Sequence, residues 1–142
     1  MEIISKAITD PGILGLFSEH DDFMLDVLGE DKRYYTRYSE DEGIEHVWGA
    51  YESGLLIGCA AFRKKAAETG EVKRLFIRKP YRGKGISREL LRTLEDYARE
   101  QGCRTLYLDT RISLEPAVSL YRSSGFQILF QRGLYIQMEK IL

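Results

Sequence analysis

The residues best suited to chemistry in this sequence lie in a basic turn between an apolar strand pattern and a helical pattern. Gly83 and Gly85 stand in the turn. The basic residues around it are Lys73, Arg74, Arg78, Lys79, Arg82, Lys84 and Arg88. A helix start exposes backbone N–H groups and the positive end of the helix dipole, so it stabilises anions, and glycine lets a ligand come close. The turn therefore predicts a binding site for a polyphosphate.

Two common phosphate-binding motifs do not fit this turn. A dinucleotide-binding fingerprint would need a third glycine where Arg88 stands. A Walker loop would need a glycine in place of Arg78 and a serine or threonine in place of Gly85. The pattern that does fit is Arg82-x-x-Gly85-x-Ser87.

This pattern resembles the coenzyme A loop of the GCN5-related N-acetyltransferase family, Arg/Gln-x-x-Gly-x-Gly/Ala, with Ser87 in the last place. A second segment, Pro116–Phe126, is similar to the family's later Ala-x-x-Leu-Tyr-x-x-x-Gly-Phe motif. Together the two motifs are specific, and the resemblance covers residues 45–140. It implies an α/β (α+β) acyl-coenzyme A N-acyltransferase fold, with residues 1–142 as one domain. The expected sheet is mixed and mostly antiparallel, with about six or seven strands, a splayed central parallel pair and about four flanking helices.

The resemblance also implies acetyl-coenzyme A (acetyl-CoA) as co-substrate. The amides of the loop would bind its diphosphate, and the end of the preceding strand would run beside its pantetheine arm as an added strand does. The expected cofactor-binding residues are Leu75, Phe76, Ile77, Arg82, Gly83, Lys84, Gly85, Ile86 and Ser87. The family often has an asparagine seven residues before its motif tyrosine. Leu114 stands there in this chain, so that cofactor contact is absent or supplied otherwise.

The expected reaction is attack of an amine on the thioester, and it needs a general base. A lysine-like amine with a pKa near 10.4 is mostly protonated at pH 7, and the gap of about 3.4 units costs roughly 4–5 kcal/mol. Glu71, at the head of a strand, is the first choice for the base, directly or through a water, as in the family. An exposed structural glutamate is the alternative interpretation. Asp109, at the end of the neighbouring strand, is the second choice.

Two further groups complete the expected chemistry. Backbone N–H groups of a bulge around residues 74–76 would stabilise the tetrahedral oxyanion. Tyr121 matches the family tyrosine that commonly protonates the departing thiolate, with a plain packing role as the alternative. The predicted activity is acetyl transfer to a primary amine of a small molecule or peptide. The alternatives are a non-catalytic acetyl-CoA sensor, which would need neither Glu71 nor Tyr121, and a nucleotide-binding domain.

The length and composition fit one soluble domain. With 142 residues, of which 44% are hydrophobic, the chain can bury about two-thirds of its unfolded surface. No apolar run approaches the roughly 20 residues of a membrane span and no signal-peptide pattern is present, which predicts a cytoplasmic protein without a membrane partner. The histidines and cysteines lack ligand-like spacing, so we expect no metal, and Cys59 and Cys103 should be small buried side chains. A homodimer is left open.

The charge is divided unevenly along the chain, although the formal net charge is −1. Residues 1–45 hold 12 acidic and 4 basic side chains, and residues 46–142 hold 10 acidic and 17 basic ones. This division suggests a basic cofactor side and an acidic region that attracts a cationic amine, with a solvated acidic helix face as the alternative. The basic residues gather around one turn and helix, so nucleic acid is not an expected partner.

These residues need a defined set of elements to position them. Val72 and Leu75 are out of phase for a strand, whereas Leu75 and Ile77 are in phase, which predicts a β-bulge near Lys73–Arg74. Apolar residues at helical spacing predict a helix over 84–101, and its place between two strands predicts a parallel pair. The other expected elements are a strand at 3–7, a helix from Pro11 to Gly29, a loop or short helix with Tyr34, Tyr35 and Tyr38 at 30–45, a hairpin of 46–52 and 55–64, strands at 70–78, 104–110, 126–130 and 134–140, and a short helix between Pro116 and Gly125.

Overall fold

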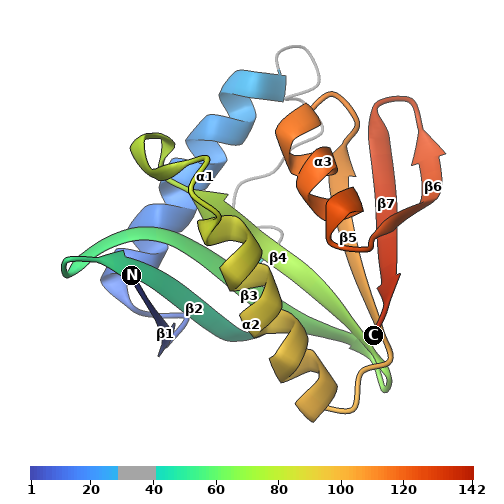
Figure 1. The fold of residues 1–142 in the computed structure, drawn as a ribbon, viewed down its shortest axis with the longest axis horizontal. Helices are drawn as coiled ribbons and strands as arrows, with labels where there is room; N and C mark the ends of the chain where they lie inside the picture. Colours follow the sequence, from blue (N-terminus) through green and yellow to red (C-terminus); the bar gives the residue numbers. More distant parts are fainter. Residues whose placement is uncertain (29–40) are drawn as a thin grey trace.

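The structure is a computed structural model that describes residues 1–28 and 41–142 of the chain. In chain order its elements are β1 (Glu2–Lys6), α1 (Pro11–Leu28), β2 (Ile44–Glu52), β3 (Leu55–Ala66), β4 (Thr69–Ile77), a 3-10 turn (Lys79–Tyr81), α2 (Ile86–Glu100), β5 (Thr105–Arg111), α3 (Glu115–Ser123), β6 (Gln127–Arg132) and β7 (Tyr135–Ile141) (Figure 1). Tyr34, Tyr35 and Tyr38 lie outside the described residues. The described part of the chain holds three α-helices where the sequence predicts about four. None of the three is long and apolar enough to cross a membrane.

The strands form one mixed sheet in the order β1-β2-β3-β4-β5-β7-β6. β4 and β5 run parallel, and the other neighbouring strands run antiparallel. The parallel strands need a long connection, which α2 supplies, whereas a short turn at Ser53–Gly54 is enough for the hairpin of β2 and β3. The predicted mostly antiparallel sheet with a central parallel pair is confirmed.

The parallel pair separates along its length (Figure 1). The paired residues are Thr69 with Thr105, Gly70 with Leu106 and Glu71 with Tyr107. β4 continues to Ile77 and β5 to Arg111 without further pairing between them. The sheet is therefore open between these two strand ends, at the point where the sequence predicts the reacting groups.

The predicted bulge lies in β4 beside this opening. Lys73 pairs with Ala61 and Phe76 pairs with Cys59 on β3, so two residues of β4 stand opposite Ala60. One of those two is Arg74, whose φ of 51° lies in the left-handed region that side chains other than glycine rarely adopt. The predicted bulge is confirmed, and it shifts the pleat so that the side chains at the end of β4 change faces.

Two apolar cores cover the two faces of the sheet. α2 and α3 pack on one face, where Leu90 and Leu94 meet Phe62 and Leu106. α1 packs on the other face and is started by the Asp10 carboxylate, which accepts a hydrogen bond from the Ile13 amide at 3.1 Å. The buried residues of α1 are Ile13, Leu16, Phe17 and Asp21. The two cysteines, Cys59 and Cys103, are buried and free, as expected.

Candidate functional site

The start of α2 presents backbone amides without protein acceptors. Gly83 and Gly85 adopt φ values of 77° and 82°, and Gly85 is the N-cap residue of the helix. The Arg82 amide donates to the Lys79 carbonyl at 3.2 Å, and the next amide that donates to a backbone carbonyl is that of Glu89, 3.2 Å from the Gly85 oxygen. Between them, no amide has a backbone acceptor among the described residues. The N-terminus of α2 can therefore receive an anion.

A cavity of about 440 Å³ opens onto these amides. We call it the α2 cavity, and its walls come from the end of β4, the start of α2 and α3. It is lined by all of the predicted cofactor-binding residues except Lys84: Leu75, Phe76, Ile77, Arg82, Gly83, Gly85, Ile86 and Ser87. The Lys84 ammonium instead lies 5.5 Å from the centre of the Tyr81 ring.

Arg82 is held at this cavity by contacts within the protein. Its Nε donates to the Ile77 carbonyl at 2.8 Å. Its guanidinium lies 4.7 Å from the Phe23 ring centre and 5.5 Å from that of Phe76, so it stacks on aromatic side chains of both α1 and β4. The basic side chain that the motif places beside the turn is thus oriented before any ligand arrives.

A second cavity of about 360 Å³ lies against α1, β4, β5 and α3. We call it the β5 cavity. The residues that line both cavities are Phe23, Leu75, Phe76, Leu114, Ala117 and Tyr121. The two cavities therefore meet beside the bulge, at the opening between β4 and β5, and a molecule in one can touch a molecule in the other.

Tyr121 lies at this junction. The motif places it on α3, and the structure buries it with its ring 5.9 Å from that of Phe126. Burial raises the pKa of the Tyr121 phenol to about 12, so the hydroxyl keeps its proton at neutral pH. Among the described side chains, no fully buried polar atom lacks a partner, and the Tyr121 hydroxyl has no hydrogen bond within the protein. Its oxygen therefore reaches the cavity.

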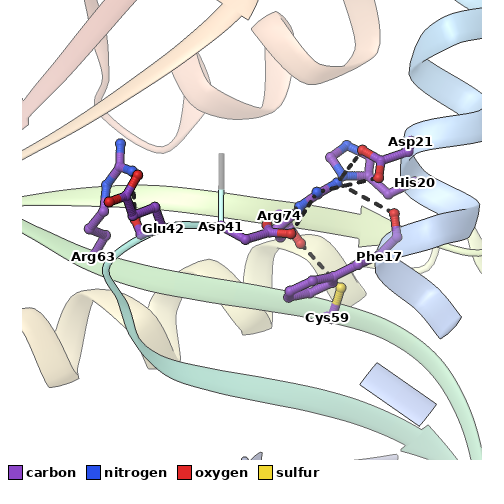
Figure 2. A network of polar contacts seen from close by, with 8 residues as sticks. All are labelled: Phe17, His20, Asp21, Asp41, Glu42, Cys59, Arg63 and Arg74. Atoms are coloured by element: carbon purple, nitrogen blue, oxygen red, sulfur yellow. Dashed lines mark hydrogen bonds and ion pairs between the residues drawn. The ribbon is translucent and has the colours of Figure 1, made fainter. Parts of the chain in front are cut away.

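The bulge is fixed by its own arginine (Figure 2). Arg74 reaches Asp21 on α1 at 2.7 Å and Asp41 at 2.7 Å, and its Nη1 donates to the His20 Nδ1 at 3.1 Å. Burial alone would lower the pKa of the Arg74 guanidinium, but Asp41 and Asp21 outweigh it and hold that pKa above its ordinary range. A buried guanidinium needs both carboxylates as partners, and the ion pair with Asp21 connects the bulge to α1.

The main chain of the bulge is also oriented. The Cys59 thiol on β3 donates to the Arg74 carbonyl at 3.2 Å. Since no peptide in the described chain is cis, the N–H of the same peptide unit, which belongs to Leu75, points the opposite way, away from Cys59. Burial raises the pKa of the Cys59 thiol to about 12, so it remains a donor and not a thiolate.

Glu71 lies in β4 but lines neither cavity. Its Oε1 is 3.0 Å from an Arg63 nitrogen and its Oε2 is 3.3 Å from the Lys73 ammonium. Burial would raise the pKa of the Glu71 carboxyl, but the Lys73 and Arg63 cations outweigh it and hold that pKa below its ordinary value. Both carboxylate oxygens are therefore engaged in ion pairs, and the competing interpretation of an exposed glutamate is wrong because the side chain is 8% exposed.

Asp109 and its neighbour Arg111 line the β5 cavity. The Asp109 carboxylate is exposed to the cavity side of β5 and accepts a hydrogen bond from the Tyr135 hydroxyl at 2.6 Å. His20, on α1, lines the same cavity. Sequence reasoning missed Arg111, His20 and Tyr135. The alternation of side chains along a strand places Arg111 on the same face as Asp109 and could have identified it, whereas no local sequence pattern connects His20 or Tyr135 with this site. Within residues 1–28 and 41–142, no group of three His, Cys, Asp or Glu side chains could hold a metal ion.

Comparison with known proteins agrees with this geometry. The chain matches the family described as the acetyltransferase (GNAT) family over residues 14–126. It is 41% identical over 81 residues to the IAA acetyltransferase of Azospirillum brasilense, which covers 54% of this chain and 51% of that protein. It is 35% identical over 96 residues to the N-alpha-acetyltransferase RimI of Mycobacterium tuberculosis, which covers 66% of this chain and 59% of that protein. The chain spans about half the length of the curated relatives it matches.

Solved structures share the fold over nearly the whole chain. A protein from Klebsiella pneumoniae described as an acyl-CoA N-acyltransferase has a TM-score of 0.81 at 27% identity, over 99% of this chain and 97% of that one. A GNAT family acetyltransferase from Elizabethkingia anophelis with acetyl-CoA bound has a TM-score of 0.75 at 18% identity, over 99% and 97%. Because the family match covers both the α2 turn and Tyr121, the chain belongs to the acetyltransferase (GNAT) family.

Proposed function

We propose that this protein transfers the acetyl group of acetyl-CoA to a primary amine of a small molecule or peptide, by direct attack through a tetrahedral intermediate. One observation carries the proposal: a cavity that starts at open helix amides and a cavity that holds a carboxylate meet at Tyr121 and the bulge. A donor in the first cavity and an acceptor in the second would bring thioester and amine together without a covalent enzyme intermediate.

The donor would lie in the α2 cavity. The free amides of residues 83–88 would bind the diphosphate, with Arg82 and Lys84 adding positive charge. The pantetheine amides would pair with the main chain of Leu75, Phe76 and Ile77, which has no strand partner on its β5 side. The family membership and the acetyl-CoA bound to the Elizabethkingia anophelis relative support this assignment.

The base would be one of the two carboxylates predicted from the sequence, and the geometry favours Asp109. Asp109 lines the acceptor cavity, whereas Glu71 lies outside it and its lowered pKa makes it a weaker proton acceptor. In this proposal Asp109 takes the proton from the acceptor ammonium, directly or through a water, and Glu71 holds Lys73 in place.

Acyl transfer follows the loss of the first proton from the acceptor. The amine lone pair forms a bond to the thioester carbon, and the carbonyl electron pair moves onto oxygen, where the bulge amide of Leu75 donates to the oxyanion. Collapse of this intermediate breaks the carbon–sulfur bond, and the electron pair of that bond stays on sulfur as a thiolate. Tyr121, whose raised pKa keeps its hydroxyl hydrogen in place at neutral pH, donates this hydrogen to the sulfur. The second proton of the attacking amine leaves the nitrogen as the acetamide forms and returns the Tyr121 oxygen to its neutral form, directly or through a water, so the products are an acetamide and a thiol.

The test is release of free thiol from acetyl-CoA on a panel of amino acids, polyamines, peptides and aminoglycosides, with acetylated product identified by mass spectrometry. Turnover of at least one amine, with tight coenzyme A binding, is the expected result. Tight binding of coenzyme A without turnover on any amine would support the non-catalytic sensor. Equal thermal stabilisation by nucleotides that lack pantetheine would point instead to a nucleotide-binding domain.

A further inference from the structure

The charged side chains of the β5 cavity differ in whether the protein satisfies them. The Lys73 ammonium is paired with Glu71, and the Arg74 guanidinium is paired with two aspartates. Arg111 is half-buried in the cavity wall and has no hydrogen bond or ion pair to any described residue. A guanidinium that is partly removed from water without a partner is unfavourable unless a ligand supplies an anion. Arg111 is thus a binding group that the protein itself does not use.

Arg111 stands beside Asp109, the one carboxylate among the described residues that line this cavity. Asp109 and Arg111 are alternate residues of β5, so both side chains lie on the same face of the sheet with their Cβ atoms about 7 Å apart. Tyr135 stands opposite Arg111 in the register of β7, and its hydroxyl holds the Asp109 carboxylate at 2.6 Å. The wall therefore presents a fixed negative group and a positive group side by side.

Three acidic residues of the first 45 positions are held in ion pairs with arginines. Asp21 and Asp41 form ion pairs with Arg74, and Glu19 forms an ion pair with Arg78 at 2.7 Å. In these pairs each carboxylate faces an arginine, so these three residues add little negative charge to the cavity. Among the described residues that line the cavity, the charged side chains without an ion pair are Asp109 and Arg111, and their charges are opposite.

We infer that the acceptor is an amino carboxylate, a molecule whose amine meets Asp109 while a carboxylate a few carbon atoms away forms a bidentate ion pair with Arg111. This inference rests on the proposed function, because it uses Asp109 as the group that receives the amine. The carboxylate can belong to a free amino acid or to a short peptide. A carboxylate and a guanidinium match each other in two parallel hydrogen bonds, which gives orientation as well as affinity.

The experiment compares matched acceptors that differ only in this carboxylate. Each amino acid is assayed with acetyl-CoA beside its carboxamide and its decarboxylated amine, and dipeptides are included to separate free amino acids from peptides. Wild type should prefer the acid over the carboxamide by about 10- to 100-fold in kcat/KM, mainly through KM. Arg111→Gln should reduce this preference to about threefold or less, and Arg111→Lys should keep part of it. The KM for acetyl-CoA should not change, and Arg92→Gln, an exposed arginine of α2, is the matched control.

Two results would overturn the inference: equal use of acids and carboxamides by wild type, or an unchanged preference in Arg111→Gln. If no acceptor turns over, the proposed function fails but the inference is still tested. In that case the same matched ligands are titrated into the full chain saturated with coenzyme A and followed by ligand-observed NMR. Weaker binding of the carboxylates to Arg111→Gln than to wild type supports the subsite, and equal binding contradicts it.

Discussion

The two cavities that meet at Tyr121 are built in opposite ways. One wall of the α2 cavity is the continuous stretch 75–88, in which strand end, turn and helix start follow one another in the chain. The β5 cavity is assembled from five elements, from His20 on α1 to Tyr135 on β7. The first is a local motif that any homologous turn can form, and the second exists only when distant elements pack correctly. A donor shared by many enzymes suits the first construction, and a specific acceptor suits the second.

The two cavities also differ in their charged groups. The α2 turn combines positive charge with open amides, both of which favour an anion. Of the charged side chains in the wall of the β5 cavity among the described residues, Lys73 and Arg74 are neutralised in ion pairs, whereas Asp109 and Arg111 are not. The difference teaches that the first cavity presents charge of one sign, while the second combines ion pairs that hold its walls with two groups of opposite charge.

The largest effect should come from breaking that architecture. Arg74→Met leaves Asp21 and part of Asp41 buried without a counter-charge, so the free energy of unfolding should fall by about 3–5 kcal/mol. The control is Arg78→Met, which removes an ion pair of the same 2.7 Å length to exposed Glu19 and should cost about 1 kcal/mol or less. Urea unfolding at pH 7 measures both. Similar losses in the two variants would show that the Arg74 network is not structural.

The next largest effect concerns catalysis in the β5 cavity. Asp109→Asn keeps the hydrogen bond from Tyr135 but removes the proposed base, so kcat should fall by about 100-fold or more while the KM for acetyl-CoA stays constant. Glu71→Gln is the matched carboxylate-to-amide change and should leave kcat at pH 7 within about threefold. Steady-state thiol release measures both variants. The reverse pattern would assign the base to Glu71.

A smaller effect should appear in the α2 cavity alone. Gly85 and Gly102 share a φ of 82°, and a Cβ on either would meet no atom within 4 Å, so alanine strains only the backbone. Both Gly85→Ala and Gly102→Ala should lower the free energy of unfolding by about 1–2 kcal/mol. Only Gly85→Ala should weaken coenzyme A binding, by about 10-fold, because a strained residue at this position changes the orientation of the neighbouring amides that would bind the diphosphate. Isothermal titration calorimetry measures the coenzyme A affinity of both variants. Equal affinities would mean that the turn at Gly85 does not bind the cofactor.

The smallest effect concerns the pH dependence of stability. The pKa of Glu71 is lower in the folded protein than in the unfolded chain, so its ion pairs stabilise fully above the unfolded pKa and are lost as the pH falls through the folded-state pKa. Glu71→Gln should therefore cost about 1–2 kcal/mol at pH 7, and this difference should shrink below about pH 4.5. Urea unfolding between pH 3.5 and 7 measures it. A difference independent of pH would mean that the ion pairs contribute nothing.

Much of the fold could be predicted because its signals are local. The phase change between Val72 and Leu75 located the bulge, and the glycine turn located the start of α2 within two residues. The residues that line one wall of the α2 cavity lie in this same stretch. The pairing of Glu71 with Arg63 could not be predicted, because Arg63 lies on β3 and meets Glu71 only through the antiparallel register. Whether a carboxylate acts as a base or as an ion-pair partner depends on its neighbours in space, and the pattern of residues within one strand does not identify them.

By itself, the sequence determined the glycine turn with its family motif, the bulge and the parallel pair, because turn glycines, strand phase and apolar spacing act over a few residues. The tertiary structure alone decided that Arg74 would be buried between two aspartates, that Glu71 would be closed off, and that Asp109 and Arg111 would line one cavity. The physical reason is that an ion pair or a cavity wall forms between side chains brought together by packing, and their separation along the chain carries no record of that contact.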